Sequence, residues 1–207
     1  MRGLKKYLRL SEKRPGWTRG PEAEALANAS FSLPENAVIV EIGSFFGSGT
    51  ILLAGPRQLR RSGMVHAVDP FDGSGDSFSI PYYDEIIAAH QGRPLRELFD
   101  ESLRLAELSD WVEVHQARAP EIGASWTTPI DLLFLDGDQS PIGARAAYEA
   151  FERWLKPGAV IALHNSNPRE YHPEHEGHRR LVLEEILPPR YTDIKLITST
   201  TFARNTA

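Results

Sequence analysis

The sequence predicts an α/β fold in which helices cover both faces of a central, mostly parallel seven-stranded sheet, with an antiparallel strand near the C-terminus. Several short runs, among them 37–42 and 130–136, are apolar at nearly every position, as expected for strands buried on both faces, with Glu41, Asp131 and Asp136 as the exceptions. These runs alternate with segments of helical periodicity, which favours parallel strands joined by helices. A glycine-rich turn links the first strand to a helix. Together these features predict a Rossmann-like three-layer sandwich.

The composition is that of one ordinary globular domain, with 207 residues, 41% of them hydrophobic and 25% charged. The lack of cysteine excludes disulfides, thiolate metal sites and a cysteine nucleophile. No apolar run approaches the ~18 residues of a membrane span or follows the basic start as in a signal peptide, so we expect a cytoplasmic protein without a membrane span. We divide the chain into a basic N-terminal arm, residues 1–20, and a single domain, residues 21–207.

Charge is unevenly distributed along the chain. The arm holds seven Lys or Arg and one acid, so the rest of the chain is strongly acidic within a net charge of −5. An acidic body repels nucleic acid, and no nucleic-acid partner is expected. Leu4, Tyr7, Leu8 and Leu10 recur at helical spacing, which suits a membrane surface, a partner or the protein's own body. We expect the arm to dock on the protein itself or to fray, and a homodimer is compatible with the sequence.

Taken in order, the core elements begin with a short helix after Gly20-Pro21-Glu22, where proline at the first helical position and an acid in the first turn are typical of a helix start. Strands are expected at 37–42, 64–69, 111–115, 130–136, 159–164, 194–199 and 200–203. Helices are expected at 23–29, from Thr50 onward, and at 95–105, 142–155 and 178–186. The segment 72–83 is rich in Gly, Ser and Asp without periodicity, which predicts a mobile loop and a candidate lid.

Ligands of a parallel α/β sheet bind beyond the carboxyl ends of its strands, so the polar residues there are the informative ones. Gly43, Gly47 and Gly49 follow the first strand, where they permit a sharp turn and close ligand approach before a helix N-terminus. Asp69 ends the next strand, where a carboxylate can accept both hydroxyls of a ribose. The combination predicts a nucleoside-containing ligand.

A short-chain dehydrogenase is a distant alternative, because its glycine spacing and a formal Tyr-x-x-x-Lys, at Tyr191–Lys195, both occur in this chain. That pair should lie on a mid-chain helix, whereas here it follows Pro188-Pro189 and enters a β-branched run. Glu41, two residues before the first glycine, also suits a cationic ligand better than a pyrophosphate.

Four motifs, Val40–Thr50, Ala67–Gly73, Asp131–Asp138 and Lys156–Gly158, resemble in order and spacing those of class I S-adenosylmethionine-dependent methyltransferases. The most similar group is the bacterial one of cephalosporin-hydroxylase-like and macrocin-O-methyltransferase-like proteins, and the resemblance covers about residues 17–187. It implies S-adenosylmethionine as cofactor and O-methylation of a hydroxyl on a small acceptor, such as a sugar or a secondary metabolite.

The resemblance also implies which residues bind the cofactor. The turn 43–49 would lie under its methionine and ribose parts, Asp69 would hold the ribose, and Pro70 and Phe71 would flank the adenine. Arg118 is the candidate side chain near the adenine amino group, where relatives commonly have a serine. The complete candidate set includes Glu41, acting on the amino-acid end or orienting the turn: Glu41, Gly43, Ser44, Phe45, Gly47, Gly49, Asp69, Pro70, Phe71, Arg118 and Asp136.

The candidate catalytic residues are His164, Asp136 and Gln139. By resemblance, Asp136 would face the methyl group or a metal, since catechol O-methyltransferase-like enzymes bind Mg²⁺ through an Asp after strand four and an Asp-Asn pair after strand five. This chain offers Asp136, His164 and Asn165 for a divalent metal, and a histidine ligand suits transition metals better than Mg²⁺. Gln139 stands where many members of the closer group have a histidine, and glutamine takes up no proton at neutral pH.

Three alternatives therefore stay open for the chemistry. The first is a metal site of Asp136, His164 and Asn165, and the second is a metal-free enzyme with His164 as base. The third is a module that binds S-adenosylmethionine or S-adenosylhomocysteine without efficient transfer. The segments 72–83 and 168–178 would build the acceptor pocket.

Histidines and tryptophans outside this set are expected to have plainer roles. His172, His175 and His178 are expected in a loop over the acceptor pocket rather than at zinc, because Pro173 disfavours a helix at His172. The four tryptophans are expected to serve packing, although Trp17 precedes the first core helix, in a segment that often closes over the cofactor in this family.

Overall fold

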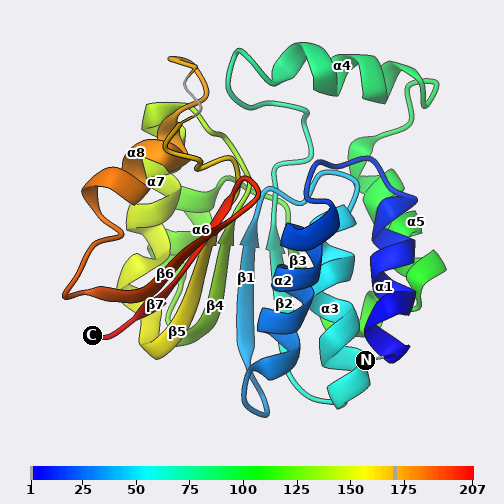
Figure 1. The fold of residues 1–207 in the computed structure, drawn as a ribbon. Helices are drawn as coiled ribbons and strands as arrows, with labels where there is room; N and C mark the ends of the chain where they lie inside the picture. The colour runs from blue at the N-terminus through cyan, green and yellow to red at the C-terminus, as the bar shows by residue number, and fades with distance from the viewer. Residues whose placement is uncertain (1, 170–171) are drawn as a thin grey trace.

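The computed structural model describes residues 2–169 and 172–207, so residues 170 and 171 of the predicted acceptor loop and Met1 of the arm lie outside it. Its seven strands are β1 (Val38–Ile42), β2 (Met64–Val68), β3 (Val112–His115), β4 (Ile130–Leu135), β5 (Leu155–Leu163), β6 (Tyr191–Ile197) and β7 (Thr200–Asn205). They form one sheet in the order β3-β2-β1-β4-β5-β7-β6 (Figure 1). Strands β1 to β5 pair in parallel, while β7 runs antiparallel to β5 and β6. The predicted mostly parallel sheet is confirmed, including its antiparallel strand.

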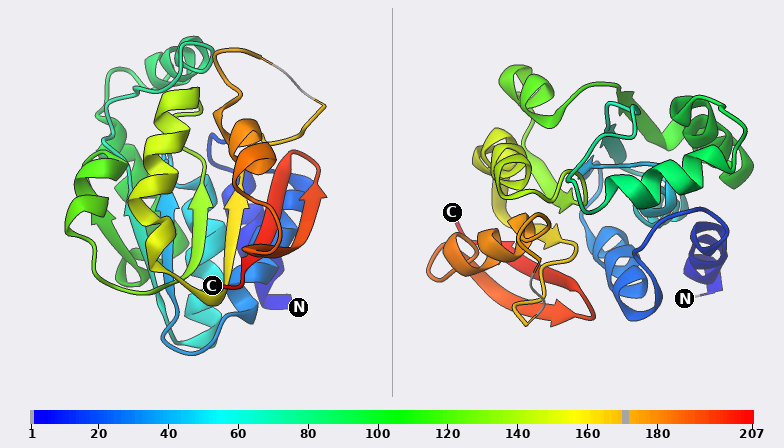
Figure 2. Two further views of the ribbon diagram at one scale, coloured as in Figure 1. Left: turned by 90° about the vertical axis from the view of Figure 1, so that its left-hand side faces the viewer. Right: turned by 90° about the horizontal axis from the view of Figure 1, so that it is seen from above.

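Helices cover both faces of this sheet (Figure 2). The helices are α1 (Arg2–Glu12), α2 (Gly20–Ser32), α3 (Ser48–Arg60), α4 (Ile80–Ala88), α5 (Leu95–Ala106), α6 (Ala119–Ser125), α7 (Pro141–Phe151) and α8 (Gly177–Glu184). The first core includes buried residues of α2, α3 and α5, and the second includes buried residues of α6, α7 and α8. The fold is thus the predicted three-layer, Rossmann-like sandwich.

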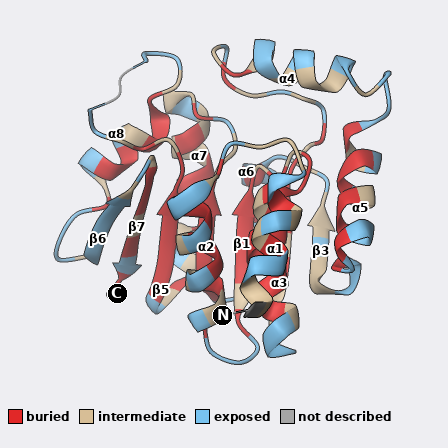
Figure 3. Ribbon diagram, turned by 45° about the vertical axis from the view of Figure 1, so that its right-hand side comes forward, coloured by how far each residue is buried: buried red, intermediate tan, exposed pale blue. Residues whose placement is uncertain are grey.

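The central strands are largely apolar on both faces because alternate residues enter two different cores, with Glu41 on β1 and Asp131 on β4 as buried exceptions. On β1, Ile39 belongs to the first core and Val40 to the second, and on β4 the same division separates Leu132 from Leu133. The edge strand β3 is only partly buried, as its intermediate shading in Figure 3 shows. The central strands thus have the continuous apolar pattern that made them recognisable, whereas β3 mixes apolar and polar residues.

The carboxyl ends of β1, β2, β4 and β5 lie at one edge of the sheet, and β1 lies between β2 and β4. The chain leaves β1 toward α3 and β2, and later returns on the other side of β1 as β4. Such a reversal of strand order opens a crevice above the sheet, where ligands of this fold class bind. Helix α4 lies across this end of the molecule (Figure 1).

Three segments differ from the sequence expectations. The predicted loop 72–83 becomes α4 at Ile80, and α6 is a seven-residue helix, too short for its periodicity to stand out. Strand β5 begins at Leu155 rather than 159, since the strand continues through Pro157 and through Gly158, which has a φ of +84°. A register shift opposite Ile130 and Leu132 accommodates these two residues, so proline and glycine mark an irregularity in the strand rather than its start.

The N-terminal arm docks on the body, as one of the two expected outcomes. Helix α1 packs against α3, and the Tyr7 side chain is 2% exposed. A Cβ at Gly55 would lie 2.1 Å from the Tyr7 ring, so glycine makes room for this contact. Among the residues described, no helix is long and apolar enough to cross a bilayer.

Candidate active site

A cavity of about 340 Å³ opens at the carboxyl end of the sheet, a volume within the roughly 300–1,000 Å³ of small-molecule sites. Its walls come from the α1–α2 connection, the β1–α3 turn and the ends of β2, β4 and β5. The segment that leads into α4 closes it from above. It therefore lies where the strand order predicted a ligand site.

The three glycines of the β1–α3 turn are required by the protein's own packing. Gly43 has a φ of +85°, and a Cβ there would lie 2.4 Å from the Cα of Gly137. Gly47 caps α3 in the left-handed conformation, with a φ of +83°. A Cβ on Gly49 would lie 2.5 Å from Oε1 of Glu41. The close approach that we attributed to a ligand is, at Gly43 and Gly49, an approach of other parts of this chain.

Glu41 lies behind this turn and is fully buried. Its Oε2 accepts hydrogen bonds from the hydroxyls of Ser44, at 2.8 Å, and Thr50, while Oε1 has no hydrogen-bond partner. Burial raises the pKa of Glu41 to about 8, and the nearby charges of Asp136 and Asp69 act in the same direction. Of the two roles expected for Glu41, these contacts favour orienting the turn, and the residue does not line the cavity.

Asp69 holds the same turn from the end of β2. Its Oδ2 accepts the backbone N–H groups of Ser44, at 2.8 Å, and Phe45, at 2.9 Å, and its Oδ1 accepts that of Phe71, at 2.6 Å. Burial raises the pKa of Asp69 despite these bonds. Because Asp69 lines the cavity, a ribose would meet a carboxylate already fixed by three amides.

The candidate adenine residues divide into two groups. Pro70 and Arg118 line the cavity, and Arg118 forms an ion pair with Asp72 at 3.2 Å. Phe71 is a correction: its buried ring packs against Phe99 with centroids 5.0 Å apart, and it does not reach the cavity. An aromatic residue at a strand end is as well suited to the core as to a ligand, and here the core takes it.

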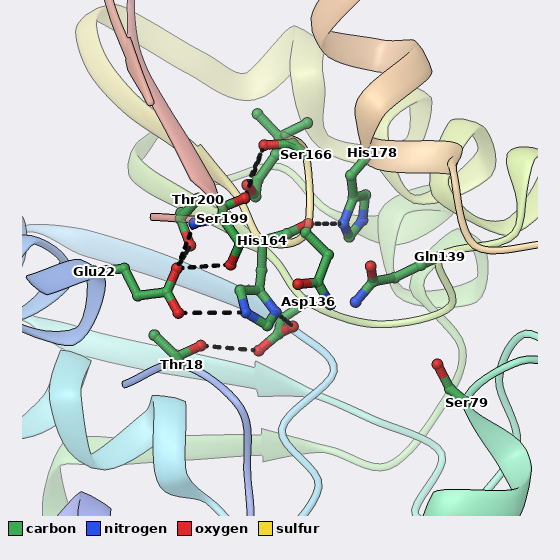
Figure 4. A network of polar contacts seen from close by, with 12 residues as sticks. Thr18, Glu22, Ser79, Asp136, Gln139, His164, Ser166, His178, Ser199 and Thr200 are labelled. Carbon is green, nitrogen blue, oxygen red and sulfur yellow. Dashed lines mark hydrogen bonds and ion pairs between the residues drawn. The ribbon is translucent and has the colours of Figure 1, made fainter. Parts of the chain in front are cut away.

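On the opposite side, a chain of polar contacts runs from the cavity into the protein (Figure 4). Oδ1 of Asp136, after β4, lies 2.6 Å from Nδ1 of His164, after β5. Nε2 of His164 forms an ion pair with Oε1 of Glu22 on α2 at 3.8 Å. Oε2 of Glu22 accepts the N–H of Ser199 and the hydroxyls of Ser199 and Thr200. Four separate parts of the chain thus meet behind one carboxylate of the cavity wall.

This chain of contacts contains a protonated imidazole between two acids. Burial alone would lower the pKa of His164, but the Asp136 and Glu22 carboxylates raise it to about 10. Burial would raise the pKa of Glu22, but its bonds from His164 and Ser199 lower it to about 2. At neutral pH His164 is therefore a buried cation with both ring nitrogens engaged.

The protonation of His164 bears on two of our expectations for this residue. A protonated ring with no free lone pair cannot act as the general base. In this protonated state it also offers no lone pair to a metal, so metal binding would have to displace a ring proton. Nδ2 of Asn165 lies 3.2 Å from Nε2 of His175. The site of Asp136, His164 and Asn165 for a divalent metal therefore stays a prediction, and no step is derived through one.

Gln139 is the third candidate catalytic residue, and it lies in the cavity wall. Its side chain is 3% exposed, and its Oε1 has no hydrogen-bond partner. Its backbone is fixed on both sides, because its N–H faces Asp76 at 3.4 Å and its C=O accepts from Gly177 at 2.8 Å. A buried amide oxygen without a partner costs free energy, so Gln139 suits a ligand that donates a hydrogen bond.

The histidines of the predicted acceptor loop point in different directions. Nδ1 of His175 lies 3.1 Å from the buried Asp76, and the ring of His172 packs on Phe78 with centroids 4.3 Å apart. His178 donates from Nδ1 to the backbone oxygen of His164, and burial lowers its pKa to about 4. The Asp76 pair joins the segment 72–83 to the loop after β5.

The cavity also has an aromatic wall that composition alone did not reveal. The ring of Trp17 lies 5.6 Å from that of Phe45 and 5.4 Å from that of Tyr83, centroid to centroid. Trp17 is 44% exposed and lines the cavity. The packing role expected for it therefore does not fully account for its position. An apolar wall facing carboxylates suits a ligand that is partly apolar and carries a positive charge.

The sequence reasoning missed several residues of the site. Glu22 was assigned only to the first turn of a helix, which explains an acid there without any long-range partner. Asp76 was part of an aperiodic segment, and Thr18, 3.5 Å from Asp136, had no distinctive neighbours. No local signal marks these three residues as part of the site, because the contacts that bring them into it join residues more than 60 positions apart.

Comparison with known proteins agrees with this geometry. A family model described as a methyltransferase domain matches residues 40–166. The O-methyltransferase TomG from Streptomyces achromogenes, involved in tomaymycin synthesis and solved in complex with S-adenosylmethionine, is similar in fold, with a TM-score of 0.66 and 20% identity over 100% of this chain and 91% of that chain. An O-methyltransferase from Bacillus cereus, in complex with S-adenosylhomocysteine, has a TM-score of 0.64 and 18% identity over the same shares.

Proposed function

The chain belongs to the methyltransferase domain family, and on that premise we propose that it transfers the methyl group of S-adenosylmethionine to a hydroxyl oxygen of a small acceptor. The observation that carries the proposal is the carboxylate of Asp136. It faces the cavity at the end of β4 and is held from behind by a protonated histidine. The acceptor would enter beneath the segments 72–83 and 172–178, which close this part of the cavity.

The residues around the cavity fit such a cofactor. Asp69 and Asp136 place negative charge on either side of the space, which suits a cationic sulfonium. Asp69 would accept the ribose hydroxyls at the edge that its three amide bonds leave free, and Arg118 and Pro70 would lie at the adenine end. The rings of Trp17 and the neighbouring aromatic wall would cover the apolar parts of the ligand.

When bound, S-adenosylmethionine would supply a methyl group on a positively charged sulfur, and in-line displacement would form the C–O bond as the C–S bond breaks. Asp136 accepts the proton of the attacking hydroxyl, which increases the nucleophilicity of the oxygen. The hydrogen bond from His164 fixes the orientation of this carboxylate, and Glu22 keeps His164 protonated. Gln139 offers its free oxygen to a second donor of the acceptor. In this arrangement, therefore, His164 is a positioning residue and Asp136 is the base.

A second candidate function is binding of the cofactor without efficient transfer. Two observations favour it. Gln139 cannot take up a proton, and both ring nitrogens of His164 are engaged. Of the three candidate catalytic residues, Asp136 alone is then left to accept the proton of the acceptor hydroxyl. The two candidates share the cofactor site and differ only in turnover.

Binding and turnover are tested separately. S-adenosylhomocysteine at a hundredfold excess over its Kd should stabilise the fold by about 2.7 kcal/mol, seen as a rise in Tm, whereas NAD should not. Asp69→Ala should abolish this shift, and a shift with NAD alone would overturn the cofactor assignment. Release of S-adenosylhomocysteine in the presence of a panel of sugar and secondary-metabolite hydroxyls then distinguishes an enzyme from a binding module.

A further inference from the structure

A second cluster of ligating side chains lies at the edge of the sheet, outside the cavity. His66 is on β2, and Glu113 and His115 are on the edge strand β3. The parallel register places His66 beside Glu113, and His115 follows Glu113 by two residues. Because residues two apart on a strand share one face, all three side chains project from the same side of the sheet. None of them lines the cavity.

The distances within the cluster match those between ligands of one tetrahedral ion. Nδ1 of His66 lies 3.1 Å from Nε2 of His115. One carboxylate oxygen of Glu113 lies 3.5 Å from that Nδ1, and the other lies 3.6 Å from that Nε2. Ligand bonds of about 2.0–2.2 Å in a tetrahedron separate neighbouring donors by about 3.3 Å. A small shift of the side chains would therefore bring one oxygen and both nitrogens to bonding distance of a shared ion.

The surroundings hold both rings in place. The ring of Trp126 meets that of His66 edge to face, with centroids 4.9 Å apart, and that of His115 at 6.0 Å. The two imidazoles are nearly parallel, with an interplanar angle of 24°. The site is thus largely formed before an ion arrives.

The cluster is also accessible to an ion from solution. The side chains of His66 and His115 are 14% and 20% exposed, whereas that of Glu113 is 59% exposed. Strand β3 is the edge of the sheet, so no further strand pairs with its outer side within the part of the chain that the structure describes. A fourth coordination position would remain for water.

We propose that His66, Glu113 and His115 bind one Zn²⁺ ion, or a divalent ion of the same ligand preference, per chain. Two imidazole nitrogens and one carboxylate are ligands that zinc accepts in tetrahedral sites. The bound ion links β3 to β2 through side chains, in addition to the backbone ladder. It therefore stabilises the edge strand whose end adjoins the adenine side of the cavity, since the backbone oxygen of His115 accepts from the N–H of Asp69 at 3.2 Å.

The proposal is tested by titrating Zn²⁺ into the full chain after chelator treatment. Calorimetry, or competition with a chromophoric chelator, measures the binding. One saturable equivalent is expected, with a rise in Tm. Glu113→Gln and His115→Gln should each weaken binding by at least about tenfold. Glu113 is exposed, so its variant is expected to fold, which circular dichroism verifies. His90 belongs neither to this cluster nor to the cavity wall, so His90→Gln is the matched control and should bind Zn²⁺ as the wild type does.

Co²⁺ provides a second readout that does not depend on stability. Bound at this site it should give the intense visible absorption of tetrahedral cobalt, and both cluster variants should lose that spectrum. The proposal is overturned if no saturable equivalent binds, or if the variants retain wild-type affinity. It is also overturned if Asp136→Asn or His175→Gln, in the cavity, abolishes binding while Glu113→Gln does not.

Discussion

The two sides of the cavity use buried carboxylates in opposite ways. On the side of the β1–α3 turn, Glu41 and Asp69 bind hydroxyls and backbone amides of their own turn, and burial raises the pKa of both. On the other side, Glu22 and Asp136 share the cation His164. Hydroxyls and backbone amides fix the orientation of a carboxylate but bring no charge to it. An imidazolium fixes the orientation and also places a positive charge beside the carboxylate. The first side is therefore suited to holding a ligand, and the second to orienting one carboxylate, that of Asp136, toward the cavity.

Replacing the buried cation His164 should cause the largest loss of stability, and it should disturb only the second side of the cavity. His164→Gln leaves the buried Glu22 facing Asp136 without a positive charge, and we expect a loss of about 3–5 kcal/mol in the free energy of unfolding. Urea unfolding at pH 7 measures it, with His90→Gln as control. Because the folded pKa of His164 is raised to about 10, its contribution is complete below about pH 6.5 and is lost as the pH rises through 10. A loss under about 1 kcal/mol at pH 7 would contradict a buried ion pair here.

A glycine substitution breaks the first side instead. Gly43→Ala combines a φ of +85° with a Cβ placed 2.4 Å from Gly137, so we expect a loss of about 3 kcal/mol. Gly158→Ala is the matched control, because its φ is +84° but nothing lies within 4 Å of the added Cβ. The control should lose only about 1 kcal/mol, from backbone strain. Equal losses in the two variants would show that the contact with Gly137 has no energetic weight.

A pH series sharpens the comparison between the carboxylates. The folded pKa of Glu41, about 8, lies above its ordinary value of 4.5, so folding takes up a proton between these values. The wild type should lose stability as the pH rises from 5 to 8, by at most about 1.4 kcal/mol per pH unit from this group. Glu41→Gln should lack that slope while keeping the acceptor for Ser44 and Thr50. Parallel stability curves for the two proteins would contradict the raised pKa.

The same comparison explains how much could be predicted from the sequence. The first side is built by contacts between residues 41–50 and Asp69, a short stretch with glycines and acids at interpretable spacing. The sheet was equally accessible, because strands such as β4 are buried along their whole length and apolar at every position but Asp131. Phe71 is the exception, since a local pattern cannot say whether an aromatic ring turns toward the core or toward a ligand.

The second side could not be predicted, because it is assembled from residues far apart in the chain. Asp136 and His164 were recognised singly, at two strand ends, but the sequence did not show that they touch. Glu22 belongs to a helix start in the sequence and to the His164 ion pair in the structure. Its contact engages the second ring nitrogen of His164, and so changed the proposed mechanism from His164 as base to Asp136 as base.

The rate of methyl transfer by Asp136→Asn, in a single turnover with an acceptor found in the panel, tests the central claim most directly. Asparagine keeps the shape of the side chain but cannot accept the proton, so the rate should fall by about 10²–10⁴-fold while affinity for S-adenosylhomocysteine stays near that of the wild type. Asp110→Asn, at an exposed position outside the site, is the control and should transfer normally. A rate within about tenfold of the wild type would contradict the assignment of Asp136 as the base.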